Sequence, residues 1–406
     1  MATDSMAVEQ AEPAGMKRNV LLLSGCVALS GTGASIVMVV TTLAGKSLAD
    51  NPLHATLPLA LQFTFTAVGA VPAALMMRRI GRRAGFTIGQ LVGCGAAAVS
   101  AYALLIQSFA LFAVGGGALL GIHNAFWQQL RFAAGETSSH RFRSRAISYV
   151  MAGGVAGALF GPELAKFGFD LFQPVLFAGS YVVIGVLCLL GIVVLQFVDI
   201  PRTDADRSGD SGRPLAEILA QPVVVVAILA GMLGYAVMSL VMTATPLAME
   251  VCGFVIGDSA RVIQWHAVAM FAPGFFTGHL IKRYGVIRVI FAGVVLNVLC
   301  LVMNTTGVAF FNFWFGLVFL GLGWNFMFVG ATNLLTEGYR PEERAKVQAA
   351  NDFLVFSGVA VASFSSGALQ EAYGWTAVNL AIALPVTVVF AAVVWYRFLY
   401  SPRATA

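Results

Sequence analysis

The stretches ETSSHRFR at residues 136–143 and EGYRPEER at residues 337–344 each place a glutamate seven positions before an arginine. The two copies lie 201 residues apart in a chain of 406, so the second half of the chain repeats the first. Each copy follows one long apolar segment and precedes another. A charged loop that recurs between apolar segments predicts a membrane bundle made of two homologous halves.

The composition agrees with a membrane location. Hydrophobic residues make up 59% of the chain and charged residues 11%, whereas a soluble domain carries roughly 25% charged residues. So few charges cannot cover a water-exposed surface of this size, and lipid is the expected solvent. The five cysteines are widely spaced and form no Cys/His cluster, which predicts neither a metal site nor a disulfide framework. No cofactor and no enzyme activity are predicted, because a Walker-type phosphate loop and a nucleophile–base set are also missing.

Twelve apolar segments approach the ~20 residues that a helix needs to cross the hydrocarbon core of a bilayer. The ninth is the shortest of them. The predicted spans are residues 20–44, 56–77, 85–106, 109–130, 146–167, 174–198, 222–246, 261–281, 288–304, 310–335, 346–369 and 375–398.

The basic residues predict the orientation of these spans. With the N-terminus in the cytoplasm and alternating sides, 21 of the 24 Lys and Arg residues, Arg131 among them, fall on the cytoplasmic side. Only Lys46, Lys166 and Arg261 fall outside, as the positive-inside rule requires. We therefore expect a multi-pass protein of the cell inner membrane with both termini cytoplasmic. The net charge of +5 then reports topology and not nucleic-acid binding.

A polar segment at the midpoint divides the chain. Residues 199–217 are rich in Asp, Arg, Ser, Gly and Pro, which is typical of a linker. The first span follows Lys17 and Arg18 and lacks the pattern of a cleaved signal, so we expect it to be retained. The predicted organisation is a cytoplasmic tail at 1–18, a six-helix bundle at 19–198, the linker at 199–217, a second six-helix bundle at 218–400 and a cytoplasmic tail at 401–406.

A second pair of repeated loops lies between spans 2 and 3 and between spans 8 and 9. The first reads RRIGRR at residues 78–83 and the second KRYG at residues 282–285. A short turn between antiparallel helices needs glycine for its tight bend. The arginines can reach carboxylates or helix C-termini on the cytoplasmic face.

These loops, the twelve spans and the two halves resemble the major facilitator superfamily. That family carries a Gly-x-x-x-Asp-Arg-x-Gly-Arg-Arg pattern between spans 2 and 3. The matching residues are Arg79, Gly81, Arg82 and Arg83 in the first copy and Gly278, Arg283 and Gly285 in the second. Ala74 replaces the first Gly, and Arg78 and Lys282 replace the Asp. The resemblance implies an all-α fold of two pseudo-symmetric six-helix bundles and secondary transport.

The resemblance also implies a gate on the cytoplasmic face. The family's loop Asp helps to latch the two halves together, and a base replaces it here in both copies. Glu136 and Glu337 are the natural substitutes, and we expect each to pair with arginines of its own half. Solvated surface ion pairs, worth about 0–1 kcal/mol each, are the alternative. The predicted gating residues are Arg79, Gly81, Arg82, Arg83, Glu136, Arg143, Arg283, Gly285, Glu337 and Arg344.

Polar and aromatic side chains inside the spans are candidates for a central substrate site. In span 4, Asn124, Trp127, Gln128 and Arg131 share one helical face, and span 10 repeats part of this set. A hydrogen-bonded seam between helices is the alternative for the amides, and a cytoplasmic topology charge the alternative for the arginine. The predicted substrate-binding residues are Asn124, Trp127, Gln128, Trp324, Asn325, Phe328, Gln264 and Trp265.

Three titratable residues are candidates for coupling transport to protons. Asp352 lies about two turns after Lys346 in span 11, and a helix-terminal charge favoured by the helix dipole is its alternative. His123 and His266 titrate near neutral pH when unperturbed. Structural, hydrogen-bonded histidines are the alternative for both.

Aromatic faces combined with amides suit a planar, polar and largely uncharged substrate. The stretches GWNF at residues 323–326 and KVQAANDF at residues 346–353 are similar to a bacterial group that includes riboflavin transporters, as are RAIS at 145–148 and GP at 161–162. Uptake of riboflavin by a monomeric transporter is the leading hypothesis. Export of drug-like compounds or metabolites is one alternative, although the antiporter motif of span 5 is incomplete here. A non-transporting membrane sensor or assembly protein is the other.

Overall fold

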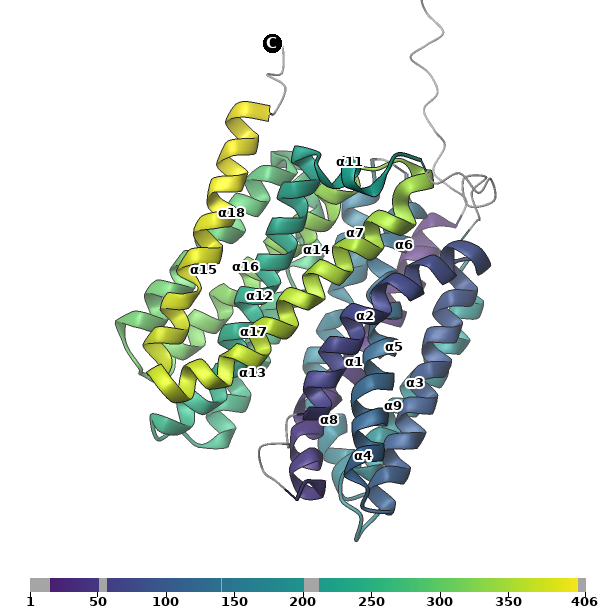
Figure 1. The fold of residues 1–406 in the computed structure, drawn as a ribbon, viewed down its shortest axis with the longest axis vertical. Coiled ribbons are helices and arrows are strands. Elements are labelled where there is room, and N and C mark those ends of the chain that lie inside the picture. The colour runs from purple at the N-terminus through teal and green to yellow at the C-terminus, as the bar shows by residue number, and fades with distance from the viewer. Residues whose placement is uncertain (1–14, 51–56, 140, 201–211, 401–406) are drawn as a thin grey trace, which may run out of the picture.

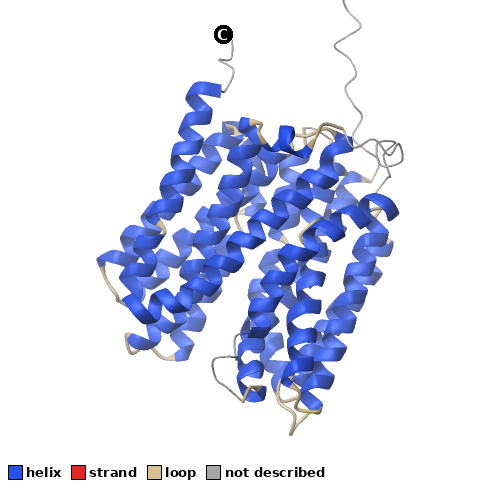
Figure 2. Ribbon diagram, in the orientation of Figure 1, coloured by secondary structure: helices blue, strands red, loops and turns tan. Residues whose placement is uncertain are grey.

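The computed structural model describes residues 15–50, 57–139, 141–200 and 212–400. In these residues the chain is built from helices and connecting turns, with no strand (Figure 2). The predicted all-α class is therefore confirmed. The two ends of the chain, part of the predicted linker and the loop at 51–56 lie outside the described residues.

The first half of the chain forms one bundle. Its first three spans are α1 (Met16–Leu48), α2 (Leu57–Ile80) and α3 (Arg82–Leu105). The fourth span is a continuous run of α4 (Phe109–Phe112), η2 (Ala113–Leu119), α5 (Leu120–Trp127) and α6 (Leu130–Glu136). The fifth consists of α7 (Arg143–Ala152) and α8 (Gly154–Phe169), and the sixth is α9 (Ala178–Gln196).

Glycines in the fourth span let it approach its neighbours closely. A Cβ atom at Gly117 would lie 2.7 Å from the Pro58 carbonyl oxygen, and one at Gly121 would lie 2.4 Å from that of Gln62. Both carbonyls belong to α2. Small residues at such crossings allow the backbones to pack directly in the absence of a hydrophobic driving force in lipid.

The second half forms the other bundle, after the short α11 (Leu215–Leu219). Its helices are α12 (Pro222–Val251), α13 (Ile256–Phe271), α14 (Gly274–Tyr284), α15 (Val286–Thr306), α16 (Phe310–Leu335), η3 (Pro341–Glu343), α17 (Arg344–Ala381), α18 (Ala383–Trp395) and η4 (Tyr396–Tyr400). Pro273 separates α13 from α14, because proline cannot donate a helical hydrogen bond. Within α17 the chain turns at Gly374, which has a φ of 76°.

Ten helical runs in the described residues are long and apolar enough to cross a membrane. The eighth predicted span is missing from this set because it is divided into two shorter helices, α13 and α14. The final run contains the last two predicted spans, which are joined at the Gly374 turn. Each of the twelve predicted spans is therefore helical in the structure, although the fourth, fifth and eighth are divided into shorter helices and the last two share α17.

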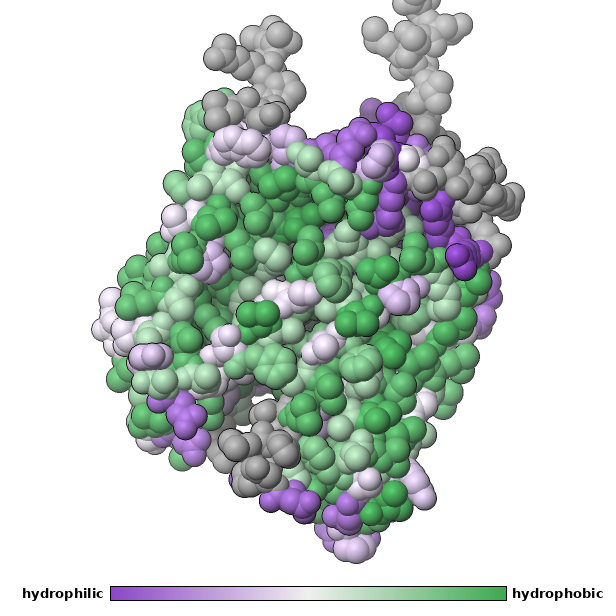
Figure 3. All heavy atoms as spheres, in the orientation of Figure 1, coloured by the Kyte–Doolittle hydropathy of each residue, from purple (hydrophilic) through white to green (hydrophobic). Residues whose placement is uncertain are grey.

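On the face shown in Figure 3, hydrophobic residues cover the middle of the molecule and polar residues gather at its two ends. Large apolar side chains are openly exposed, including Phe311 at 66% and Leu384 at 73%. Exposed apolar area of this kind is expected where lipid, not water, is the solvent.

The two bundles pack against each other most closely at the end that carries the Glu-x6-Arg loops, which we call the basic end. It lies at the top of Figure 1, where α1 begins and η4 ends. Here α7 of the first half crosses α14 of the second, and a Cβ at Gly278 would lie 2.5 Å from the Ser144 carbonyl oxygen. Ile147 and Met151 of α7 are part of the second half's core. The halves therefore share packed side chains at this end.

Candidate gate and substrate site

Two glycine bends carry the repeated arginine loops at the basic end. Gly81 joins α2 to α3 with φ 92° and ψ 154°, and Gly285 joins α14 to α15 with φ 86° and ψ 150°. Positive φ of this size is readily available only to glycine. The predicted need for glycine in both bends is confirmed, and the two bends have matching geometry.

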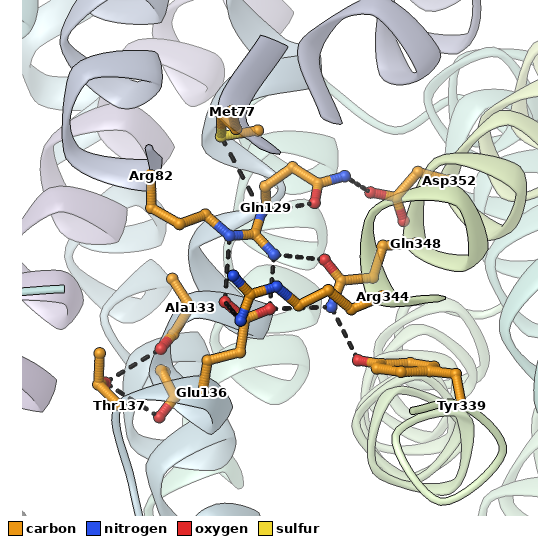
Figure 4. Close-up of polar contacts among 11 residues, drawn as sticks. Met77, Arg82, Gln129, Ala133, Glu136, Thr137, Tyr339, Arg344, Gln348 and Asp352 are labelled. Carbon is orange, nitrogen blue, oxygen red and sulfur yellow. Dashed lines mark hydrogen bonds and ion pairs between the residues drawn. The ribbon is translucent and has the colours of Figure 1, made fainter. Parts of the chain in front are cut away.

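Glu136, the last residue of α6, is the centre of an ionic cluster between the halves (Figure 4). Its Oε1 accepts a hydrogen bond from Arg82 Nη2 at 2.6 Å, and its Oε2 accepts one from Arg82 Nε at 3.1 Å. From the second half, Arg344 Nη1 lies 3.6 Å from Oε2, and Gln348 Nε2 donates to Oε1 at 3.1 Å. Arg82 Nη2 also donates to Gln348 Oε1 at 2.5 Å. One carboxylate thus bridges α3 and α17.

The expectation that each glutamate pairs within its own half is corrected by this geometry. Glu136 binds Arg82 as expected, but it also meets Arg344 of the second half. Glu337 has no ion pair with a second-half arginine among the described residues; burial raises its pKa, and the charge of Arg143 in the first half opposes that rise. The cause is the position of the repeated loops, which face each other across the boundary between the bundles. Arg344 of the second copy therefore contacts the glutamate of the first, and Arg143 of the first copy affects the pKa of the glutamate of the second through its charge.

The remaining predicted gating residues lie outside the buried cluster. Arg79 is exposed, and Arg83 is exposed and donates to Gln196 Oε1 at 3.0 Å. Arg283 is exposed, and its guanidinium lies 5.3 Å from the ring centroid of Tyr284. At the 204-residue offset of the glycine loops, Val286 stands where the first copy has Arg82. The two loops therefore share their bend but not their buried arginine.

A second link between the halves is an ion pair buried beside this cluster. Arg131 Nη2 donates to Asp352 Oδ1, and each side chain is 1% exposed. Gln129 Nε2 donates to Asp352 Oδ2 at 2.6 Å. Arg131 also lies 4.6 Å from the ring centroid of Phe328 in the second half.

Two alternatives from the sequence are excluded by these contacts. Arg131 is not a solvated topology charge, because α6 continues the fourth span past residue 130 to Glu136 and buries it. Asp352 is not a helix-terminal charge, because α17 begins eight residues earlier at Arg344 and the dipole effect fades within the first turn. The sequence prediction ended the fourth span at residue 130, one residue before Arg131. It also did not show that Arg131 and Asp352 meet.

Trp324 and Phe328 of α16 form a stacked pair, with ring centroids 4.9 Å apart and planes at 18°. Tyr235 of α12 meets both rings edge-on, at 5.3 and 5.2 Å. The sequence reading missed Tyr235, although a tyrosine in the middle of span 7 is a signal that could have identified it. The indole Nε1 of Trp324 is buried without a hydrogen-bond partner in the protein.

Asn124 and Trp127 line a small cavity inside the first bundle. Its walls also include Ser30 and Gln62, and its volume is about 20 Å³, which is enough for about one water molecule. Asn124 donates to Thr66 Oγ1 at 3.1 Å, and the Oδ1 of Asn124 and the Oε1 of Gln62 are buried without partners. Gln128 lies away from this cavity and accepts a hydrogen bond from Arg131 Nη1 at 3.0 Å. The predicted face of span 4 is therefore divided between the cavity and the interface.

The other candidates are separated from these groups. Asn325 is fully buried and is bonded within its own half, to Thr277 Oγ1 at 2.7 Å and to the Met270 carbonyl at 2.6 Å. Trp265 is 48% exposed, with its ring centroid 5.9 Å from that of Trp314. Gln264 precedes it on α13 and is partly buried.

Both candidate histidines are held by backbone carbonyls. His123 Nδ1 lies 2.9 Å from the Gly89 carbonyl oxygen, and His266 Nδ1 lies 2.8 Å from that of Leu317. Both side chains are buried within their own bundles. These contacts match the structural role that the sequence left open.

Two six-helix bundles whose repeated charged loops join at one end define a two-fold repeated membrane transporter. The sequence model of the Major Facilitator Superfamily matches residues 23–303 and 259–406. The chain belongs to that family, and it is a transporter and not an enzyme. The predicted fold, its class and the family resemblance are thus confirmed.

Relatives and solved structures agree with this assignment. The chain is 40% identical over 365 residues to "Riboflavin transporter RfnT" of Brucella anthropi, covering 89% of this chain and 92% of the relative. It is 26% identical to "Uncharacterized MFS-type transporter YdeG" of Bacillus subtilis, covering 94% and 92%. The crystal structure of the transporter FucP in the outward conformation matches with a TM-score of 0.73 at 15% identity, covering 93% of this chain and 98% of that one. A bacterial homologue of the iron transporter ferroportin in an outward-facing state gives 0.72 at 15% identity, covering 94% and 99%.

Proposed function

We propose that this protein takes up riboflavin across the cell inner membrane. The observation that carries the proposal is the 40% identity, over most of both chains, to a protein named as a riboflavin transporter. The paired aromatic rings and free amide oxygens of the spans are the chemistry that a planar, hydrogen-bonding ring requires.

The basic end is the cytoplasmic gate in this proposal. The distribution of Lys and Arg supports a cytoplasmic position for the basic end and for both termini. The clusters around Glu136 and Asp352 hold that end closed, so substrate enters from the opposite face. Rocking of the two bundles must break both clusters to release substrate into the cell.

The substrate-binding residues in this proposal come from both halves. Trp127 and Asn124, with Gln62, offer one aromatic face and two acceptor oxygens without partners. Trp324 and Phe328 offer the second aromatic wall. A cavity of about 20 Å³ is too small for a ring system, so α5 must move relative to its neighbours for a ring to enter. Gln128, Asn325, Gln264 and Trp265 have supporting roles, because each is bonded elsewhere or lies to the side.

Asp352 is the proposed proton-coupling group. As a carboxylate it holds Arg131 and Gln129 of the first half at the gate. A proton on Asp352 cancels its charge and weakens this link, which couples proton movement to opening of the basic end. The transporter acts as a monomer in this scheme, since each chain contains both halves of the gate.

The non-transporting alternative loses its main support in this geometry. The feature of the sequence that favours this alternative is the replacement of the loop Asp by a base in both copies. Glu136 at the end of α6 supplies a carboxylate that binds Arg82 of the first loop, and so provides the latch that a transporter needs.

A riboflavin auxotroph that lacks its own importer tests the proposal. Cells carrying the chain should grow at limiting riboflavin and accumulate labelled riboflavin, and cells with empty vector should do neither. The Asp352→Asn variant, expressed to the same level in the membrane, should fail to accumulate the label. Equal growth of vector and wild type would contradict uptake, and faster loss of preloaded riboflavin from cells with the chain would indicate export.

A further inference from the structure

Arg213, in the linker between the halves, binds Glu343 in the second copy of the repeated loop. Arg213 donates from Nε to Glu343 Oε1 and from Nη2 to Glu343 Oε2, both at 2.7 Å, and from its backbone N–H to Oε1 at 3.0 Å. The Arg340 backbone N–H donates to the same carboxylate at 2.9 Å. A two-pronged guanidinium–carboxylate pair with added backbone donors is a strong and directional link. The Glu343 side chain is 0% exposed.

Arg213 reaches both ends of this loop. Besides Glu343, its Nη2 lies 3.4 Å from the Gly338 carbonyl oxygen, which also accepts a hydrogen bond from Gln221 Nε2 at 3.0 Å. Gly338 directly follows Glu337, and Glu343 directly precedes Arg344. The two residues that Arg213 holds are therefore the chain neighbours of the two residues of the repeated motif.

A further contact joins the linker to the first turn of α17. Lys346 Nζ donates to the Arg213 carbonyl oxygen. Arg344, Gln348 and Asp352 are spaced four residues apart, so they lie along one face of α17. All three contact the first half. Fixing the start of α17 thus fixes the direction in which this face points.

Among the described residues, the first copy of the motif has no equivalent ion pair. Phe142 occupies the position that matches Glu343, and its ring packs 6.1 Å from that of Tyr149 and 4.8 Å from the Arg145 guanidinium. Apolar packing therefore takes the place of the buried carboxylate. In the part of the chain that the structure describes, the ion pair between the linker and a repeated loop is found in the second copy.

We propose that Arg213 and Glu343 are positioning residues for the gate: they tie the linker to the second Glu-x6-Arg loop and so aim Arg344 and Gln348 at Glu136. This rests on the gate assigned above, but not on riboflavin as the substrate. The linker thereby does more than connect the halves, because its residue Arg213 takes part in the closed gate.

Distances between two spin labels, measured by double electron–electron resonance, test this proposal. Labels at Lys17→Cys in the first half and Arg288→Cys in the second, both exposed at the basic end, are placed in a protein without native cysteines. In the absence of substrate, Glu343→Gln and Arg213→Gln should each raise the population with a long distance about fivefold or more. The double variant should show no larger shift than either single one, because both remove the same link.

Glu342→Gln is the matched control, since Glu342 is the adjacent carboxylate and is not bonded to Arg213 in the structure. It should leave the distances unchanged. Arg213→Lys keeps the charge but loses the two-pronged hydrogen bonding of the guanidinium. It should shift the distances by less than Arg213→Gln does, and it can replace the stronger variants if they do not fold. Wild-type distances in folded Glu343→Gln, or an equal shift in Glu342→Gln, would overturn the proposal. The measurement needs no substrate, so failure of riboflavin uptake leaves its outcome unaffected.

Discussion

Glu136, the last residue of α6, lies 3.6 Å from Arg344, the first residue of α17, and so joins the glutamate of one repeat to the arginine of the other. The reciprocal charge, Arg143, opposes the burial-driven rise in the pKa of Glu337. The two copies of the motif therefore interact across the boundary between the halves, and not only within their own half. The first link has more partners than the second, because Arg82 and Gln348 also bind Glu136.

Glu136→Gln should weaken closure of the basic end. The change keeps the shape of the side chain but leaves Arg82, which is 7% exposed, without its carboxylate. Removing one partner of a buried pair costs about 3–5 kcal/mol, so a cysteine placed at the interface of α7 and α14 should react with a maleimide at least tenfold faster. Glu250→Gln, at an exposed glutamate near the end of α12, is the control. An unchanged rate in Glu136→Gln would show that the cluster does not hold the gate.

Gly278→Val should hold the basic end open by steric means alone. The Cβ would lie 2.5 Å from the Ser144 carbonyl oxygen and 2.6 Å from Arg145 Cα, which are backbone atoms that cannot move aside. The halves must separate, so we expect uptake to fall below a tenth of wild type with the protein still in the membrane. Gly367→Val is the control, because a Cβ there meets no atom within 4 Å. Wild-type uptake in Gly278→Val would mean that this crossing opens freely.

Some features of this gate could be predicted from the sequence, and others could not. The twelve spans, the two halves and the glycine bends follow from periodic, local patterns, and the structure agrees with them. The pairing partners do not, because Glu136 and Arg344 are brought together by the packing of two bundles. Local spacing also could not show that Asn325 is saturated by Thr277 and Met270, or that Arg131 is buried.

Asp352→Asn should abolish the response of uptake to protons. The change leaves Arg131 buried without a charged partner, so we expect uptake to fall at least about tenfold, and the remaining uptake to ignore an imposed proton gradient. Labelled substrate entry into vesicles, with and without a proton ionophore, measures both effects. Asp258→Asn, at the partly exposed partner of Arg261, should behave as wild type. A gradient response that survives in Asp352→Asn would assign coupling to another group.

Trp127→Ala should raise the KM for riboflavin about tenfold. Loss of one stacking face and its buried area removes roughly 1–2 kcal/mol of binding, while the gate remains intact. Initial rates of uptake over a range of riboflavin concentrations separate KM from the maximal rate. Phe311→Ala removes an exposed aromatic ring outside the proposed site and should leave both unchanged. An unaltered KM in Trp127→Ala would remove the fourth span from the substrate site.

The ion pair between Arg213 and Glu343 should make the stability of the protein depend on pH in the acid range. Hydrogen bonds from Arg213 lower the pKa of Glu343 from 4.5 to about 2. A depressed carboxyl pKa contributes stability that is complete above the unfolded value and declines as the pH falls toward the folded value. The difference in Tm between wild type and Glu343→Gln should therefore be constant above about pH 5 and shrink from pH 4.5 downward. A difference that grows in acid would contradict the ion pair.

The most direct test of the account is riboflavin transport by the purified protein in liposomes. Labelled riboflavin should accumulate inside above its external concentration when the interior is alkaline, and accumulation should collapse when a proton ionophore is added. Asp352→Asn and Gly278→Val should both fail to accumulate it. Liposomes that contain folded wild-type protein and take up riboflavin no faster than empty liposomes would contradict the central claim.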